Sequence, residues 1–341
     1  MHPLRPSLLA LALLGAGLAA CKPQTPAPSQ PAAEAAQPAA TSDAATDAKL
    51  SELSRQWLDG WMPLNPVAAT QIGKHDYDAK LDDLSAAGRQ KLVDFSKKLL
   101  TELDAIDTGK LSRENQIDAA ILRNQLRSDI WNLETLQSWA WDPQVYSGLA
   151  GGAIYNLMAR DFAPMPQRLR SATARMEKIP TLFTQMRENL DPARVPKIHA
   201  ETVAKQNAGL LSLIDGLVMP YADQIHGEDR KKLDEAVAGL RKAVAEQQKW
   251  LDETLVPNAK GDFRLGQTLY DEKLQYSLNS SLSRAEIKQR AESELKRVRG
   301  EMYAIAQTVL KDKAGAPAMP ANPTPEQQQK AIEAALELAY A

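Results

Sequence analysis

Apolar residues recur at intervals of three and four along most of the chain, and this spacing constrains the fold more than any other feature. Leu50, Leu53, Trp57 and Trp61 show it first. Such spacing places the side chains on one face of an α-helix. No convincing run alternates with a period of two between turn residues, as a half-buried strand would. The sequence therefore predicts an all-α protein, built as an irregular array of antiparallel helices joined by short loops.

Capping residues predict where several helices begin and end. Asn65 and Pro66 suit the start of a short helix that Gly73 would end, and Ser283 with Glu286 has the spacing of a capping box. Longer helical stripes are expected in segments 85–106 and 112–133, which begin at the caps Ser85 and Ser112, and in segment 169–190, bent at Pro180. Segments 198–217 and 233–255 are expected to be helices that end at Pro220 and Pro257. Segment 324–340 is also expected to be helical, but it has no glycine at its end and resembles an interrupted element.

Two stretches lack a clear helical pattern. Residues 138–164 contain aromatic side chains together with Gly148, Gly151 and Gly152, and are expected to bend the chain and present the aromatic residues. Residues 259–283 are expected to form a packed loop. Both stretches interrupt the helical array in this interpretation.

The only cysteine lies near the N-terminus, so no disulfide can form within the chain. An apolar stretch, too short to span a bilayer as a helix, is followed by Leu18-Ala19-Ala20-Cys21. These four residues resemble the lipobox of bacterial lipoproteins. We expect residues 1–20 to be a signal peptide and Cys21 to carry the lipid that attaches the protein to a membrane. The alternative is a signal peptide that contains a cysteine by chance.

Residues 21–46 are rich in proline, alanine, serine and glutamine and lack large apolar side chains, which predicts a disordered tether. The helical body would then span residues 47–341. Lys22 follows the cysteine where aspartate would favour the inner membrane, so the expected location is the cell envelope, anchored in the outer membrane and facing the periplasm. The formal net charge of −2, from 41 basic and 43 acidic residues, gives no reason to expect a nucleic-acid partner.

Motifs of common catalytic sites are absent from the sequence. None of the four histidines belongs to an HExxH motif, and no nucleophile elbow, Walker loop or dinucleotide-binding fingerprint occurs. We therefore predict no catalytic residue and no metal ligand in this chain. The acidic cluster from His75 to Asp83 could bind a cation or line an acidic pocket, or could be a solvated loop whose aspartates cap the next helix. Arg160 and Asp161 are interpreted as an ion pair near a helix end.

An ordered series of short blocks resembles a bacterial envelope family, domain-of-unknown-function family 885. The resemblance spans roughly Leu50 to the last residue. The blocks are Asn65-Pro66, Ala69-Thr70, Gly73, His75 and Asp78; Asp161 to Pro164 with Arg168; Ile179-Pro180, Leu190 and Val195-Pro196; Leu265-Gly266, Leu269-Tyr270, Lys273-Leu274 and Leu282-Ser283; and Arg297 to Met302.

The resemblance implies a largely helical zincin-like metallopeptidase about twice as long as this body, with a zinc-binding helix in its later half. Zinc and a peptide substrate are thus expected for full-length members, and this chain would be the N-terminal half, truncated before the zinc site and inactive alone. The family's N-terminal helices form one wall of a deep channel, so the candidate wall residues are His75, Asp78, Tyr155 and Arg160. The alternative function is a non-catalytic helical binding or scaffold lipoprotein.

Overall fold

The computed structural model describes residues 42–340. The predicted signal peptide, Cys21 and most of the predicted tether lie outside these residues. The first helix begins at Ala44, because the side chain of Asp43 accepts a hydrogen bond from the backbone N–H of Ala45 (3.1 Å). The helical body thus starts slightly before the boundary expected at residue 47.

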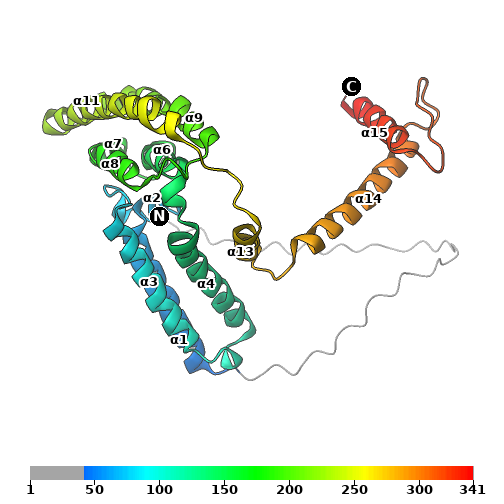
Figure 1. Cartoon of the computed structure of the whole chain (residues 1–341), viewed down its shortest axis with the longest axis horizontal. Coiled ribbons are helices and arrows are strands. Elements are labelled where there is room, and N and C mark those ends of the chain that lie inside the picture. Colours follow the sequence, from blue (N-terminus) through cyan, green and yellow to red (C-terminus); the bar gives the residue numbers. More distant parts are fainter. Residues whose placement is uncertain (1–41, 341) are drawn as a thin grey trace, which may run out of the picture. The chain divides into compact units, whose positions relative to one another are not determined.

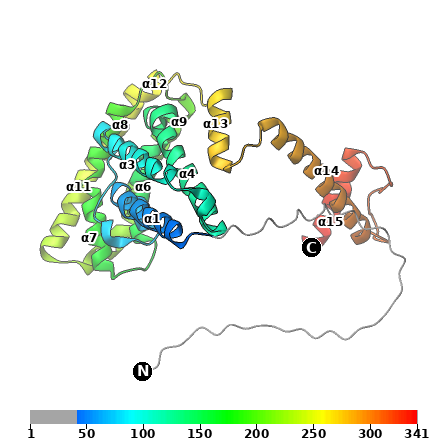
Figure 2. The ribbon, with the colours of Figure 1, turned by 90° about the horizontal axis from the view of Figure 1, so that it is seen from below.

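The described part of the chain consists of helices joined by loops (Figures 1 and 2). The α-helices are α1 (Ala44–Leu64), α2 (Pro66–Gln71), α3 (Ala86–Asp104), α4 (Arg113–Trp131), α5 (Ser138–Trp141), α6 (Gln144–Met158), α7 (Met165–Met176), α8 (Ile179–Asn189), α9 (Lys197–Gln206), α10 (Gly209–Leu213), α11 (Gly227–Trp250), α12 (Val256–Asn258), α13 (Gln267–Leu278), α14 (Arg284–Val309) and α15 (Pro325–Tyr340). Three 3₁₀ turns are η1 (His75–Tyr77), η2 (Thr108–Lys110) and η5 (Met219–Gln224), and three π-helical turns are η3 (Asn132–Leu136), η4 (Ile214–Val218) and η6 (Leu251–Leu255). Within residues 42–340 no strand forms, and only Pro196 and Gly261 make an isolated parallel bridge. The prediction of an all-α fold is confirmed.

The predicted helix starts agree with the structure where a serine supplies the cap. The hydroxyl of Ser85 accepts from the backbone N–H of Gly88, and that of Ser112 accepts from Asn115. Ser283 and Glu286 form the complete capping box, with Glu286 accepting from the Ser283 N–H (2.8 Å). Each contact pairs a backbone donor that the first helical turn leaves without a partner.

Helices α1, α3 and α4 lie side by side and share a small core (Figure 1). Leu50 from α1, Leu99 and Leu103 from α3, and Leu126 from α4 are at most 2% exposed. Each occupies the stripe that predicted its helix. Burial of one such side chain contributes about 1.5–3 kcal/mol, so this three-helix group is stabilised mainly by its leucines.

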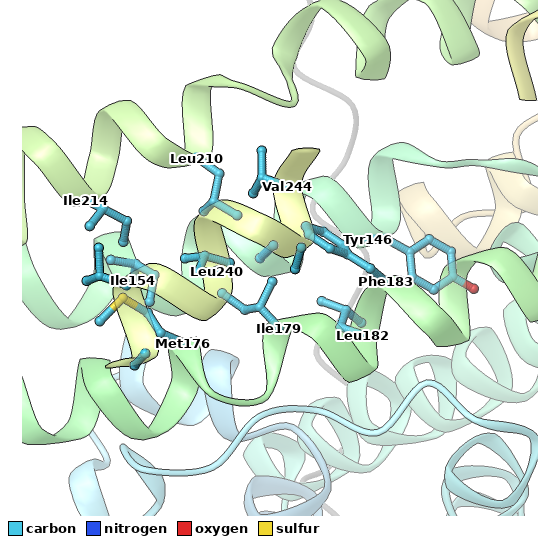
Figure 3. Close-up of a cluster of buried hydrophobic side chains, with 14 of the residues drawn as sticks. Tyr146, Ile154, Met176, Ile179, Leu182, Phe183, Leu210, Ile214, Leu240 and Val244 are labelled. Carbon is cyan, nitrogen blue, oxygen red and sulfur yellow. The ribbon is translucent and has the colours of Figure 1, made fainter. Parts of the chain in front are cut away.

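A larger core joins α6, α7, α8 and α11 (Figure 3). Ile154, Met176 and Ile179 are fully buried, and Leu240 reaches the same cluster from α11. The polar tip of the buried Tyr146 donates to the backbone carbonyl of Trp139 (2.7 Å), which satisfies its hydroxyl. This core fixes α6 and α7, the two helices behind the candidate site.

Three local predictions were wrong. Residues 169–190 form two helices instead of one bent at Pro180, because Pro180 lies in the first turn of α8, where a missing N–H costs nothing. Most of 138–164 is helix α6, since burial of its apolar residues outweighs the cost of its three glycines. The expected packed loop at 259–283 contains helix α13.

The stripes 198–217 and 233–255 also deviate from single α-helices. The first is divided among α9, α10 and η4, and the second passes from α11 into η6. Both of these π-helical turns, η4 and η6, are followed within two residues by a proline, Pro220 and Pro257 respectively. A proline ring clashes with the carbonyl four residues earlier in a regular α-helix, and a widened turn moves that carbonyl away.

Helices α14 and α15 pack against each other through Tyr303, Ala306 and Ala331. An apolar stripe on α14 stays exposed, and it consists of Leu295 (60%), Val298, Met302, Ile305 (62%) and Val309. Among the described residues, no helix is long and apolar enough to cross a membrane.

Candidate functional site around His75 and Asp78

The candidate site is built on the turn that follows α2. Pro66 occupies the first turn of α2, as predicted, and Gly73 adopts a positive φ of 91° just after the helix. The chain then enters the short turn η1, which carries His75. Thr70, near the end of α2, and Asp78, just after η1, are thereby brought together.

Asp78 is a buried carboxylate, only 6% exposed. Its Oδ1 accepts a hydrogen bond of 2.6 Å from the hydroxyl of Thr70, and its Oδ2 lies 3.0 Å from Nδ1 of His75. From the sequence, this loop could either line an acidic pocket or be a solvated turn. The structure shows that the loop is buried at Asp78. With Nδ1–H directed at Asp78, a neutral His75 keeps the lone pair on Nε2.

A buried arginine from a distant helix compensates the negative charge. Arg175 on α7 is fully buried, and its Nη2 donates to the hydroxyl of Thr70 at 2.6 Å. It also donates to the backbone carbonyls of Pro66, Lys80 and Ala153. Burial lowers its pKa to about 10, while the nearby Asp78 and Asp82 oppose that effect, so it remains a cation at neutral pH.

Asp82 is the second carboxylate near Arg175. Its Oδ2 accepts a hydrogen bond of 3.1 Å from the backbone N–H of Val67 at the start of α2. Burial raises the pKa of Asp82 to about 6, against the opposing effects of the Val67 N–H and of Arg175. Asp82 thus loses its proton near pH 6, whereas an ordinary aspartate loses its proton at about pH 4.

The imidazole of His75 is held flat against Phe162. The two rings are parallel within 5°, with centroids 3.7 Å apart, and the side chain of His75 is 30% exposed. The guanidinium of Arg168 also lies near Phe162, 5.9 Å from the centre of its ring. Stacking and the Asp78 contact fix the imidazole on a partly open surface.

The four predicted wall residues are only partly brought together. His75 and Asp78 are in direct contact. Arg160 reaches the same region, because its Nη1 donates to the backbone carbonyl of Gln71 at the end of α2 (2.8 Å). Tyr155 on α6 is 52% exposed, and no hydrogen bond or ring contact joins it to the other three among the described residues.

Other predicted polar contacts were reassigned by the structure. Asp161 pairs with Arg168 (3.0 Å) instead of with its neighbour Arg160.

Three residues of the site were not predicted. Thr70 and Phe162 belong to the blocks that carry the family resemblance, but the sequence did not single them out as site residues. Arg175 was missed as well, although it lies on the apolar stripe of α7 beside Leu169 and Met176. A charged residue on such a stripe indicates a buried partner.

Chemically, this arrangement can present a histidine whose Nε2 accepts a proton or a hydrogen bond. The aspartate behind it fixes the tautomer. Among residues 42–340, no group of three or more His, Cys, Asp or Glu side chains is placed to hold a metal ion.

The fold and this site define an all-α protein in which a histidine–aspartate pair is held against a buried arginine. The chain belongs to the family of bacterial proteins of unknown function DUF885, whose sequence model matches residues 66–339. It is also similar to the structure of a candidate lipoprotein of unknown function from Shewanella oneidensis, with 27% sequence identity and a TM-score of 0.70. That match covers 84% of this chain and 51% of the other, so this chain spans about half the length of the Shewanella protein. Among curated proteins no match was found.

Proposed function

We propose that this chain is the N-terminal portion of a lipid-anchored envelope protein of the zinc-peptidase type, and that its helices form one wall of a peptide-binding channel. The observation that carries the proposal is the fixed, partly exposed imidazole of His75, backed by Asp78. Such a group can hydrogen-bond to a peptide without further reorganisation. Zinc would be held by the part of the larger protein that corresponds to the other half of the Shewanella relative.

The lipid anchor rests on Cys21 and on the similarity to a candidate lipoprotein. Mass spectrometry of the protein from membranes is expected to find a processed chain that begins with an acylated Cys21. The Cys21→Ser variant should stay unprocessed. Lys22→Asp is the matched control for location, because it keeps the anchor and should move the protein from the outer to the inner membrane. Release of wild-type protein into the soluble fraction would contradict the anchor.

The exposed apolar residues of α14 support a second helical part as partner, since an exposed apolar stripe is typical of an interaction surface. The DNA that follows codon 341 provides a direct test. An in-frame or frameshifted HExxH helix would support the peptidase proposal. An unrelated gene would instead favour the alternative of a helical binding or scaffold lipoprotein.

The role of His75 can be tested in the longer protein. If His75 binds the peptide, His75→Ala should raise KM about tenfold, the effect of one lost hydrogen bond, and leave kcat nearly unchanged. His226→Ala is a control, because His226 lies before α11 and outside this site. The present chain alone should retain no stoichiometric zinc after dialysis and should cleave no peptide. Tight zinc retention by this chain would overturn the assignment of the metal to the other part.

A further inference from the structure

A second cavity lies away from His75, between α5, α9 and the segment that leads into α13. Its volume is about 550 Å³, within the range of small-molecule and peptide sites. Three aromatic side chains line it: Trp141, Phe263 and Tyr270. Phe263 is 51% exposed and Tyr270 is 49% exposed. Single exposed aromatic residues are common, but a group around one cavity indicates a binding surface.

Hydrogen bonds to backbone carbonyls hold both walls of this cavity in place. On one side, the N–H of Gly261 donates to the carbonyl of Val195 at 2.8 Å, which fixes the segment that carries Phe263. On the other, Asn124 of α4 donates to the carbonyl of Tyr276 at 2.9 Å and thereby anchors α13. The indole N–H of Trp141 donates to Leu136 (2.9 Å). These contacts fix the walls of the cavity, which reduces the entropy lost on binding.

The polar groups of the cavity favour an anion. Arg264 stacks on Phe263, 4.4 Å from the ring centre, and Lys273 is exposed on α13. The acidic groups nearby are Asp142, whose Oδ1 accepts from the backbone N–H of Gln144, and Asp262, 3.5 Å from Arg264 in an exposed pair. Lys273 has no ion-pair partner among residues 42–340, so a ligand carboxylate can gain a contact there.

His199 adds a directional group to this cavity. Its Nδ1 is buried without a hydrogen bond and faces Asp142, whose Oδ1 is 3.4 Å away. Its ring lies 6.1 Å from that of Trp141. Because Nδ1 is buried, Nε2 is the ring nitrogen left for a ligand. A peptide N–H or carbonyl could bind it, depending on the tautomer.

We propose that this cavity binds an aromatic carboxylate, with the ring among Phe263, Tyr270 and Trp141 and the carboxylate at Lys273 and Arg264. The C-terminal aromatic residue of a peptide and a free aromatic acid share this chemistry. The site is separate from the channel wall at His75, and it would bind in a catalytic or a non-catalytic protein alike.

The test uses the full chain purified in detergent and isothermal titration with three probes. These are the peptide Ala-Ala-Phe, its C-terminal amide and N-acetylphenylalanine. Binding of Ala-Ala-Phe with at least a tenfold loss for the amide is expected, because the amide cannot form the charge-assisted contact. If N-acetylphenylalanine binds as tightly as the peptide, the site is supported and the free acid is its ligand. Equal binding of peptide and amide, or no binding at millimolar concentration, overturns the proposal.

Exposed positions allow variants that leave the fold intact. Lys273→Gln should weaken the peptide about tenfold and remove most of its preference over the amide. Tyr270→Ala should weaken peptide and amide to the same extent, since it removes ring contact alone. Lys288→Gln on α14 makes the same charge change away from the cavity and should bind as wild type. Unchanged binding by both Lys273→Gln and Tyr270→Ala would place the ligand elsewhere and overturn the proposal.

Discussion

Arg175 donates a hydrogen bond of 2.6 Å to the hydroxyl of Thr70, and through this contact α7 is fixed to α2. The same hydroxyl lies 2.6 Å from Asp78 and donates to it, so cation, hydroxyl and carboxylate form one buried chain. In a low-dielectric interior each member depends on the others, because a buried charge without a partner is costly. The orientation of His75 is therefore linked to an arginine about a hundred residues away in sequence.

Replacing the buried guanidinium should destabilise the whole body. Arg175→Met keeps the apolar length of the side chain but removes the donor to the Thr70 hydroxyl and to three backbone carbonyls, and with it the cation near Asp78. We expect a loss of about 3–5 kcal/mol in the free energy of unfolding, as for other broken buried pairs. Urea unfolding followed by circular dichroism at pH 7 measures it.

Arg170→Met on the same helix is the matched control. Arg170 pairs with Asp229 at 3.2 Å, but both side chains are exposed, so its removal should cost less than about 1 kcal/mol. An equal effect of the two substitutions would mean that the network around Arg175 contributes no more than a surface pair.

Asp82 should make stability depend on pH between about 4 and 6. Its pKa is about 6 in the folded protein against 3.8 in the unfolded chain, so the protonated form favours folding and this contribution is lost as pH rises through 6. Asp82→Asn keeps an acceptor for the Val67 N–H and cannot ionise. The variant should match wild type near pH 4 and become more stable toward pH 7, by at most about 3 kcal/mol.

The neighbouring Asp83 gives a control of opposite sign. Burial acts to raise the pKa of Asp83, but hydrogen bonds from Ser85 and Gln185 hold this pKa below its usual value. Its contribution is present above the unfolded pKa and is lost as pH falls, so Asp83→Asn should be destabilising at pH 7. Parallel pH profiles for the two variants would contradict this assignment.

The apolar stripe of α14 should bind a hydrophobic dye. Leu295 and Ile305 are each about three-fifths exposed on the same helix. Substituting both by glutamine should lower the fluorescence of bound anilinonaphthalene sulfonate and leave the melting temperature of this chain unchanged. Ile198→Gln on α9 is the control, because Ile198 is similarly exposed (58%). Equal dye loss in the control would show that the dye does not report the stripe.

The sequence predicted those features that are encoded locally. Helix starts at Ser85, Ser112 and Ser283 follow from capping chemistry within one turn, and the pair of His75 and Asp78 lies within one short loop. Helix α6 was missed because its stability depends on distant partners. Gly152 shows this, since an added Cβ would lie 3.7 Å from a methyl carbon of Val67 on α2. Arg175 was missed for the same reason, as no local pattern specifies which carboxylate a buried arginine will meet.

A pair of glycines offers the last test, on the segment that forms the aromatic cavity. A Cβ at Gly261 would lie 1.9 Å from the carbonyl oxygen of Arg194, so alanine must push two backbone segments apart. Gly261→Ala should lower the free energy of unfolding by about 1–3 kcal/mol or more and weaken peptide binding as Phe263 moves. At Gly300, inside α14, a Cβ meets nothing within 4 Å. Gly300→Ala should therefore stabilise α14 by about 0.5–1 kcal/mol and leave peptide binding unchanged. Chemical unfolding and titration with Ala-Ala-Phe measure both, and a Gly261→Ala protein as stable as wild type would mean that the contact with Arg194 does not fix this segment.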